Sequence, residues 1–412
     1  MLVDDINLSE LEFWELPWAE RDAAFATLRR ERPTAFFEEP ELEGMPRGPG
    51  YYAICRHADV IEMSRRPELF CSGKGATAVI DMPEFMLEFF GGMINMDDPK
   101  HARQRKIVSA SFTPRMLARA MDDVVAITHQ VLDSVDAKPR VDLVQEISAK
   151  LPLVFICNMM GIPATEHQRV FEASNIILSM GDPEYVPDDV NPIQAFMEAG
   201  GDLNQLMVSL AAERMEHPTD DLTSALIHAE IDGERLTHEE LASFFILLVV
   251  AGNETTRNAI SHGVWLFDQH PDQRKIWLDD LDEVTPTAVE EIVRYATPVI
   301  NMRRTVTGDV EVGGQQYHEG DKVLLYYNSA NRDEAVFEDP DRFDVRRNPN
   351  PHVGFGGPGP HFCLGAHLAR REITVMLQEL YRRYPDLHVT GEPEQLRSSF
   401  INGIKHLEVA LA

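Results

Sequence analysis

The chain has 412 residues, 44% hydrophobic and 26% charged, which is an ordinary composition for a globular protein with a large core. Its 68 acidic and 38 basic residues give a net charge of −30, which argues against nucleic acid or an anionic membrane as the main partner. Four scattered cysteines are too few for a disulfide framework.

The N-terminal residues Met1–Asp5 lack the basic and apolar segments of a signal peptide. The longest apolar run, 244–251, is much shorter than the roughly 20 residues that cross a bilayer. We therefore expect a cytoplasmic enzyme that has no stable membrane anchor and that is a monomer.

The absence of internal repeats and of linkers predicts a single domain over residues 1–412. Its β-rich parts are expected at about 33–56 and 299–328 and in a C-terminal hairpin, and its helical parts at about 58–296 and 366–384. The predicted fold class is therefore mainly α with a minor β part.

The individual elements follow from apolar periodicity and from proline and glycine positions, with Pro286 predicted to start a helix. Helices are expected over 8–31, 58–66, 100–111, 114–135, 142–159, 165–180, 192–215, 221–229, 237–269, 271–281, 285–296 and 366–384. Strands are expected at 35–37, 51–55 and 322–328, a hairpin over 309–317 with its turn at Gly313-Gly314, and a last hairpin around Asn402-Gly403. Residues 71–98 form an apolar, irregular segment typical of a pocket wall or lid.

The most informative stretch is the glycine- and proline-rich loop 354–365, which carries Cys363 and leads into the helix that follows. Backbone N–H groups of such a loop and the positive end of the helix favour a thiolate, which is a good ligand for haem iron. Two alternatives remain: a buried structural cysteine, and a zinc site using His361 and Cys363, for which the sequence supplies no further ligands at metal spacing.

A second motif lies in the middle of the predicted helix 237–269, where Ala251-Gly252-Asn253-Glu254-Thr255-Thr256 replaces the apolar pattern. Ala251 and Thr255 share one helix face, and the small residues leave room for a flat cofactor and a diatomic ligand. Glu254 is adjacent and can relay protons. The alternative is a simple kink in a buried helix.

Charged residues form the remaining candidates. His101 and Arg105 share a helix face and suit a carboxylate, whereas Arg303 and Arg304 alternate along a predicted strand, so that one of them points inward. Glu291 and Arg294, spaced i,i+3, form either an exposed pair or, together with Arg342, a buried charge network.

Taken together, these motifs resemble those of the cytochrome P450 family of haem-thiolate monooxygenases, over essentially the whole chain. The Ala-Gly-x-x-Thr-Thr helix, the Glu-x-x-Arg helix and the Gly-x-His-x-Cys-Leu-Gly loop carry the resemblance. Further segments, among them 11–14, 90–94, 348–352 and 400–405, look like the mycobacterial-type branch that hydroxylates terminal methyl groups of methyl-branched lipids and steroid side chains. One departure is that Phe355 lies eight residues before Cys363 instead of the usual seven, so the loop has one extra residue.

The resemblance implies the cytochrome P450 fold, with haem b between the long central helix and the Cys-bearing loop and with Cys363 as axial ligand of the iron. It implies that His101, Arg105, Arg304 and His361 hold the haem propionates, and that Ala251, Gly252, Phe355 and Gly365 line the haem. Thr255 and Glu254 would deliver protons to dioxygen. Glu291, Arg294 and Arg342 would be structural.

The implied reaction inserts one oxygen atom from O2 into an unactivated C–H bond, with expected omega-hydroxylation of a methyl-branched fatty acid, isoprenoid lipid or sterol side chain. The apolar candidates for the pocket wall are Ile80, Met82, Phe85, Phe90, Ile94, Ile177, Phe196, Leu247, Val250, Val299 and Phe400, with Ala251 beside the haem.

Electrons would come from a ferredoxin and a ferredoxin reductase, and ultimately from NAD(P)H, because the chain has no flavin or nicotinamide motif. A basic docking patch is expected from Lys106, Arg115, Arg119, Arg370 and Arg371. The alternatives are a peroxide-driven hydroxylase and a non-catalytic haem-based sensor or lipid carrier.

Overall fold

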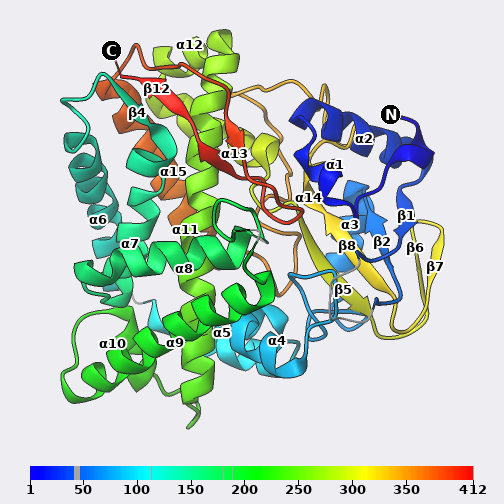
Figure 1. Cartoon of the computed structure of the whole chain (residues 1–412), viewed down its shortest axis with the longest axis horizontal. Coiled ribbons are helices and arrows are strands. Elements are labelled where there is room, and N and C mark those ends of the chain that lie inside the picture. The colour runs from blue at the N-terminus through cyan, green and yellow to red at the C-terminus, as the bar shows by residue number, and fades with distance from the viewer. Residues whose placement is uncertain (41–46, 113, 180, 188, 412) are drawn as a thin grey trace.

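In the computed structural model, a large helical part lies beside a smaller part built on a β-sheet and the N-terminal helices (Figure 1). The structure describes residues 1–40, 47–112, 114–179, 181–187 and 189–411, without the side chains of residues 88, 91, 114, 115 and 117. Helices hold 54% of the residues and strands 11%, so the predicted class, mainly α with a minor β part, is confirmed.

The helices follow the order expected from the sequence. They are α1 (Leu11–Glu15), α2 (Trp18–Glu31), α3 (His57–Ser64), α4 (Glu84–Gly91), α5 (Lys100–Ser111), α6 (Pro114–Asp133), α7 (Lys150–Met160), α8 (His167–Ser179), α9 (Pro192–Glu216), α10 (Leu222–His228), α11 (His238–Gln269), α12 (Pro271–Asp279), α13 (Leu281–Ala296), α14 (Tyr327–Ala330) and α15 (Ala366–Arg383). Short 3₁₀ turns lie at Val3–Asp5, Gly92–Asn95 and Ala164–Glu166, and a π-helical turn at Val144–Ser148 precedes α7.

The strands form one five-stranded sheet and three smaller sheets. They are β1 (Thr34–Phe37), β2 (Tyr51–Ile54), β3 (Phe70–Cys71), β4 (Arg140–Asp142), β5 (Asn301–Val306), β6 (Val310–Val312), β7 (Gln315–Tyr317), β8 (Lys322–Tyr326), β9 (His388–Val389), β10 (Glu394–Gln395), β11 (Ile404–His406) and β12 (Glu408–Ala410). The large sheet has the order β1-β2-β8-β5-β3, and its β2–β8 pair is parallel while its other pairs are antiparallel.

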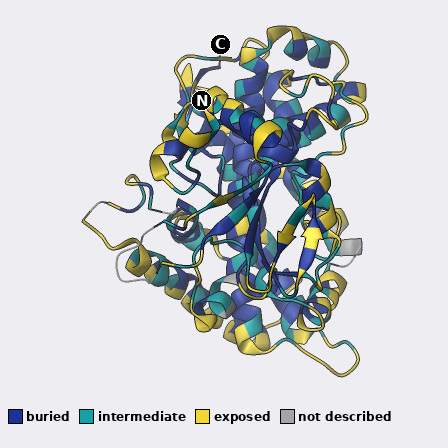
Figure 2. Cartoon of the chain, turned by 90° about the vertical axis from the view of Figure 1, so that its right-hand side faces the viewer, coloured by how far each residue is buried: buried dark blue, intermediate teal, exposed yellow. Residues whose placement is uncertain are grey.

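Helix α11 runs through the middle of the helical part (Figure 1), and most of its residues are buried. Buried residues fill the interior of the molecule, and exposed ones lie mostly at its outer loops and helix surfaces (Figure 2). It starts with a capping box, in which the Thr237 hydroxyl accepts from the Glu240 N–H at 3.1 Å and the Glu240 carboxylate accepts from the Thr237 N–H at 2.9 Å. It ends at Gln269 because Pro271, which starts α12, disfavours helical backbone at His270.

Two apolar cores meet along α11. Its N-terminal half, from Leu241 to Val250, packs with α7, α8, α9 and α10. Its C-terminal half, from Ala259 to Phe267, packs with α6, α13 and α15. The segment 251–258 lies between these cores and contains the polar motif 251–256, and α11 is continuous through it.

Three predicted boundaries are wrong, each for a local reason. The helix expected over 8–31 is divided into α1 and α2, because Leu16 has extended backbone before Pro17. Helix α13 begins at Leu281, so that Pro286 lies inside it near its N-terminal end instead of starting it. The irregular segment 71–98 contains α4, whose eight residues are mostly apolar.

The two predicted glycine turns have different outcomes. Gly313 and Gly314 have φ angles of 62° and 82°, as a two-residue type I′ turn requires, and they connect β6 to β7 as expected. The predicted C-terminal hairpin is present as β10 and β11, but Asn402 and Gly403 lie at the end of its longer connection instead of forming a two-residue turn. Asn402 instead packs the C-terminus onto the helices, since its Oδ1 accepts from the Trp18 indole N–H at 2.9 Å.

His406 on β11 connects the C-terminal strands to two carboxylates, those of Asp142 on β4 and of Glu184. Burial alone would lower the pKa of His406, but the hydrogen bonds and charges of these two carboxylates outweigh burial and raise it. The stabilisation from the protonated ring is therefore complete below the unfolded pKa of about 6.5 and is lost as pH rises through the folded value.

We expect His406→Gln to lower the melting temperature more at pH 6 than at pH 8.5, when both proteins are compared with wild type at each pH. The control is His388→Gln, which removes an exposed ring that contacts the backbone carbonyl of Asp386 instead of a carboxylate. Equal losses at both pH values for His406→Gln would contradict the assignment.

Candidate active site

The Cys363 loop runs from Gly354 to the start of α15. The Cys363 N–H donates to the carbonyl of Phe355 at 3.0 Å, which closes the loop on itself. Gly356 has a φ angle of 88°, in the left-handed region that favours glycine. Cys363 is exposed, whereas the other three cysteines are buried. The loop therefore presents one accessible sulfur.

Opposing effects act on the ionisation of the Cys363 thiol. The backbone N–H groups of Gly365 and Ala366 and the guanidinium groups of Arg105 and Arg370 favour the thiolate, as predicted. Desolvation by the surrounding loop is the larger effect, and it raises the pKa of Cys363. The loop donors and the two guanidinium groups therefore offset part of the cost of burying a thiolate.

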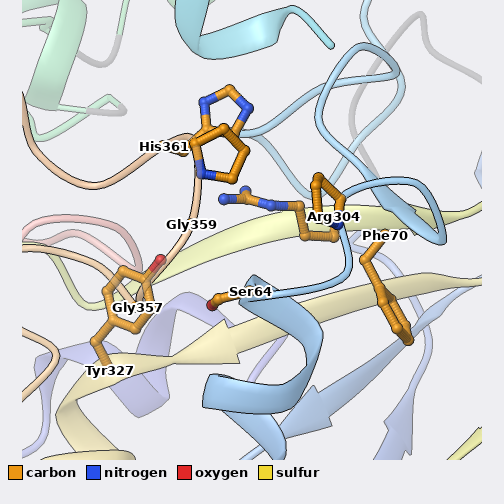
Figure 3. Close-up of a pocket in the computed structure, with 9 residues that line it drawn as sticks. Ser64, Phe70, Arg304, Tyr327, Gly357, Gly359 and His361 are labelled. Carbon is orange, nitrogen blue, oxygen red and sulfur yellow. The ribbon is translucent and has the colours of Figure 1, made fainter. Parts of the chain in front are cut away.

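The extra residue of the loop is accommodated against the end of α3 (Figure 3). A Cβ atom at Gly357 would lie 2.4 Å from Ser64 Oγ, and one at Gly359 would lie 2.3 Å from the Ser64 carbonyl oxygen. Glycine at both positions allows the longer loop to lie flat on α3. The Phe355 ring packs partly buried against the core of α11, α13 and α15, with the Arg370 guanidinium 4.2 Å from its centroid.

On α11, the polar segment has an open face. Ala251 is exposed although the residues before it, Val249 and Val250, are buried. The Thr255 hydroxyl donates to the Ala251 carbonyl at 2.8 Å, as the sequence suggested it would. Gly252 lies on the partly covered side of the helix, where Ile156 is its nearest neighbour. Ala251 and Thr255 thus border open space in the middle of an otherwise buried helix.

Glu254 points in a different direction from Thr255. Its side chain is buried between α11 and α8, where it forms an ion pair with Arg257 and accepts a long hydrogen bond from Asn258. Arg257 in turn donates to Asn175 Oδ1 on α8 at 2.9 Å. Burial raises the pKa of Glu254 more than the nearby cation lowers it. The two predicted proton carriers are neighbours in sequence but lie on separate helix faces.

Four cationic or donor side chains converge beside the Cys363 loop. The rings of His101 on α5 and His361 lie with their centroids 4.3 Å apart. Arg105 donates to the carbonyls of Pro360 and Phe362 at 2.8 and 2.7 Å. Arg304 on β5 points toward His361, and both line a small cavity with Tyr327 and Ser64 (Figure 3).

This convergence leaves a strongly positive edge. Burial and the charges of Arg304, His101 and Arg105 lower the pKa of His361 to about 3. The buried Nε2 of His101 has no hydrogen-bond partner among the residues that the structure describes. An anionic group at this edge would satisfy that nitrogen and neutralise the arginines.

Arg303 and Arg304 point to opposite faces of the sheet, because successive side chains alternate along β5. Arg303 points to the opposite face, where it donates to the carbonyl of Val79 at 3.1 Å and to the carboxylate of Asp81 at 2.7 Å. The structure therefore places Arg304, and not Arg303, beside His361.

The Glu291–Arg294 pair is fully buried and belongs to a charge network, so it is not an exposed surface pair. Arg294 donates to both carboxylate oxygens of Glu291, at 2.7 and 2.8 Å. The sequence assignment of Arg342 as the third charged member is wrong, because the guanidinium that reaches Glu291 is that of Arg347, at 3.1 Å. Arg342 is exposed and contributes its backbone carbonyl. Nothing in the spacing distinguished these two arginines.

The predicted pocket walls fall into separate groups. Five of them belong to one apolar cluster between α4, α8, α9 and α11: Phe90, Ile177, Phe196, Leu247 and Val250. Within it the Phe90 and Phe196 rings lie 4.0 Å apart. Val299 and Phe400 belong to a second cluster, which also contains five residues that were not predicted as pocket walls: Leu178, Tyr185, Met302, Leu396 and Ile401.

The remaining wall candidates are less closely associated with these clusters. Ile94 lies in the 3₁₀ turn after α4 and is half-buried. Met82 lines a polar cleft with Arg303 and Lys322, and Ile80 offers its carbonyl to Arg303. Phe85 is 62% exposed and is not brought into either cluster.

The predicted basic patch is largely paired with acidic side chains. Lys106 contacts Asp232 at 2.7 Å, Arg119 contacts Asp123 at 3.7 Å, and Arg370 forms an ion pair with Glu290. Arg371 is half-buried, and the side chain of Arg115 lies outside the described residues.

Two features of the described residues bear on metal binding and on membrane insertion. Among the described residues, no group of three or more His, Cys, Asp or Glu side chains is arranged to hold a metal ion. Within the same part of the chain, the helices include none that is both long enough and apolar enough to cross a bilayer.

Comparisons with known proteins agree with this geometry. The family described as Cytochrome P450 matches residues 81–407. The chain is 51% identical over 410 residues to a methyl-branched lipid omega-hydroxylase of Mycobacterium tuberculosis, covering 99% of this chain and 95% of the relative. It is 41% identical to a steroid C26-monooxygenase of Mycolicibacterium smegmatis, covering 98% of this chain and 91% of the relative.

A solved structure extends the likeness to the fold. The Mycobacterium marinum cytochrome P450 CYP268A2, in complex with pseudoionone, superposes with a TM-score of 0.93 at 41% identity, covering 99% of this chain and 98% of that chain. Motifs, architecture and relatives agree, and the chain therefore belongs to the cytochrome P450 family and is a P450 monooxygenase.

Proposed function

We propose that α11 and the Cys363 loop would hold haem b, that Cys363 would ligate its iron, and that His101, Arg105, Arg304 and His361 would hold its propionates. The positive edge supports this proposal most directly, because it offers two arginines and an unpartnered buried imidazole nitrogen to an anionic group. The accessible sulfur of Cys363 and the open face at Ala251 fit the same group. Bound thiolate-ligated haem iron supplies the chemistry that cleaves dioxygen.

The protein's own contribution is proton handling and the exclusion of water. We assign Thr255 the role of orienting a proton at its hydroxyl group. In the structure this hydroxyl donates to the Ala251 carbonyl at 2.8 Å, and its rotation would turn the proton toward the open face of α11. Glu254 would hold the reserve proton, because its desolvated carboxyl group has a raised pKa. Ala251, Gly252, Phe355 and Gly365 would line the haem.

The substrate we propose is a lipid with a methyl-branched end, hydroxylated at the terminal methyl group. The apolar cluster of Phe90, Ile177, Phe196, Leu247 and Val250 supports a hydrocarbon substrate, and the names of the two relatives indicate terminal positions on branched lipids and on a steroid side chain. Electrons would come from a ferredoxin and its reductase, in the cytoplasm.

We expect turnover of a methyl-branched fatty acid with O2, ferredoxin and reductase to give mainly the terminal alcohol. A primary C–H bond is harder to attack than its tertiary neighbour, so terminal selectivity requires a pocket that admits only the end of the chain. Product analysis by mass spectrometry checks the position. Mainly in-chain alcohols would contradict the proposal while leaving the monooxygenase activity unaffected.

A further inference from the structure

A polar cleft of about 460 Å³ lies between β5, β8 and residues 73–87. Arg303 on β5 and Lys322 on β8 line it, and each of these side chains is only 2% exposed. Sites for small molecules commonly have this volume, and they combine apolar walls with a few polar groups. This cleft has both kinds of wall, because Met82 and Leu87 line it beside the two cations.

Arg303 and Lys322 hold one carboxylate between them. Asp81 Oδ1 accepts from Arg303 Nη2 at 2.7 Å, and Asp81 Oδ2 contacts Lys322 Nζ at 2.9 Å. Burial would raise the pKa of Asp81, but the hydrogen bonds and charges of the two cations outweigh burial and lower it. The other two charged residues that line the cleft, Lys74 and Glu84, have opposite charges. Arg303 and Lys322 are thus spaced to bind both oxygens of one ionised carboxylate, and we call them the carboxylate seat.

The carboxylate that occupies the seat is much more exposed than the seat itself. Asp81 is 59% exposed, whereas the second anion near the seat, Glu39, is buried and contacts Lys322 Nζ at 2.7 Å. Glu39 balances one of the two positive charges, so one further anion is needed, and leaving a buried cation unpaired would be costly. Arg303 Nε is also buried and has no hydrogen-bond partner among the described residues. The seat therefore requires a carboxylate, and the one that it holds is accessible to exchange.

Helix α4 connects the carboxylate seat to the apolar cluster of the proposed substrate pocket. Leu87 lines the cleft, and Phe90, one helical turn later, belongs to the apolar cluster. Asn95 fixes α4 beside the seat, because its Nδ2 donates to the Leu87 carbonyl at 3.2 Å and its Oδ1 accepts from the Ala76 N–H at 2.9 Å. The Ala76 carbonyl in turn accepts from the backbone N–H of Arg303 at 2.8 Å. A ligand with an anionic head at the seat can therefore extend a hydrocarbon tail along α4 toward this cluster.

We propose that the carboxylate seat binds the carboxylate of a methyl-branched fatty acid, which takes the place of Asp81 on Arg303 and Lys322 while the tail extends into the apolar cluster. The exchange conserves charge, because one carboxylate replaces another on the same two cations. The seat would thereby favour acids over neutral lipids with the same tail. This inference names the head group of the substrate and rests on the proposed function.

The test compares a methyl-branched fatty acid with its methyl ester, which has the same tail and no charge. Isothermal titration calorimetry of the holoprotein gives the dissociation constant of each. Asp81→Asn removes the competing carboxylate, so we expect it to tighten binding of the acid several-fold and to leave binding of the ester unchanged. Arg303→Gln should weaken binding of the acid several-fold. If Arg303→Gln fails to fold, the result for Asp81→Asn decides alone.

The matched control is Asp279→Asn, which makes the same change of charge in an exposed pair with Lys275 on α12. Its side chain is 63% exposed, much like that of Asp81, and the variant should bind the acid and the ester as wild type does.

Any result for Asp81→Asn other than a gain specific to the acid overturns the seat. Equal changes for acid and ester would show that Asp81 only fastens the segment 78–81 to the sheet, and they would leave the proposed function intact. If the wild-type protein neither binds nor hydroxylates the acid or the ester, the proposed substrate class is wrong together with the seat.

A second readout is diffraction from crystals of the holoprotein with the acid bound. Electron density should place the carboxylate of the acid on Arg303 and Lys322, with the Asp81 side chain turned away from them. Density that shows Asp81 still on both cations and the carboxylate of the acid elsewhere would overturn the exchange.

Discussion

Replacing Cys363 by alanine should abolish the absorbance band near 450 nm that we expect when the reduced holoprotein binds carbon monoxide. The band depends on a thiolate ligand, and Cys363 is the exposed cysteine, while Cys55, Cys71 and Cys157 are buried elsewhere. Hydroxylation of a branched fatty acid should be lost together with the band. A difference spectrum of the purified variant and product analysis check both expectations.

The matched control is Cys71→Ala, which removes a cysteine from the short edge strand β3 and should keep both the band and the activity. The positive edge at His101, Arg105, Arg304 and His361 remains in Cys363→Ala, so some haem binding is compatible with the proposal. Persistence of a full 450 nm band in Cys363→Ala would remove the assignment of the axial ligand.

The features that sequence predicted well are those set by local chemistry. Helix α5 runs from Lys100 to Ser111, which are the predicted bounds. Helix α11 starts one residue after its predicted start, because the Thr237–Glu240 capping box fixes that end. The Gly313-Gly314 turn follows from the positive φ angles that two glycines allow. Apolar periodicity, helix-capping residues and turn residues act over a few positions, so they can be recognised directly in a sequence.

The features that sequence missed depend on contacts between distant segments. Arg342 and Arg347 lie in the same irregular stretch, and only the folded path of that stretch shows which of them reaches Glu291. The helix and loop donors that favour the Cys363 thiolate are visible in the sequence, whereas the desolvation that acts against it is not.

Arg294→Met should destabilise the protein by about 3–5 kcal/mol, the range observed when one partner of a buried ion pair is removed. Arg294 and Glu291 are fully buried, and the guanidinium also donates to the carbonyls of Asn331 and Pro340, at 2.7 and 2.9 Å. The substitution leaves these acceptors and part of the Glu291 charge without partners in a place that water does not reach. The free energy of unfolding in urea checks the loss.

The matched control is Arg382→Met, which breaks another i,i+3 pair, with Glu379 on α15, whose side chains are 45% and 27% exposed. We expect that loss to stay within about 1 kcal/mol, as for other exposed pairs. Similar losses in the two variants would mean that the buried network does not hold this part of the fold.

The effect of Arg294→Met should also reach the Cys363 loop. Arg294 fixes the backbone of Asn331, whose side-chain oxygen accepts from the Val353 N–H at 2.7 Å, one residue before the loop begins. Loss of Arg294 therefore frees the segment that positions Cys363, so the variant should retain less haem per chain than Arg382→Met at equal protein concentration. Unchanged haem retention with a large loss of stability would assign the network to the fold alone, whereas loss of both would make Arg294 a positioning residue for the thiolate.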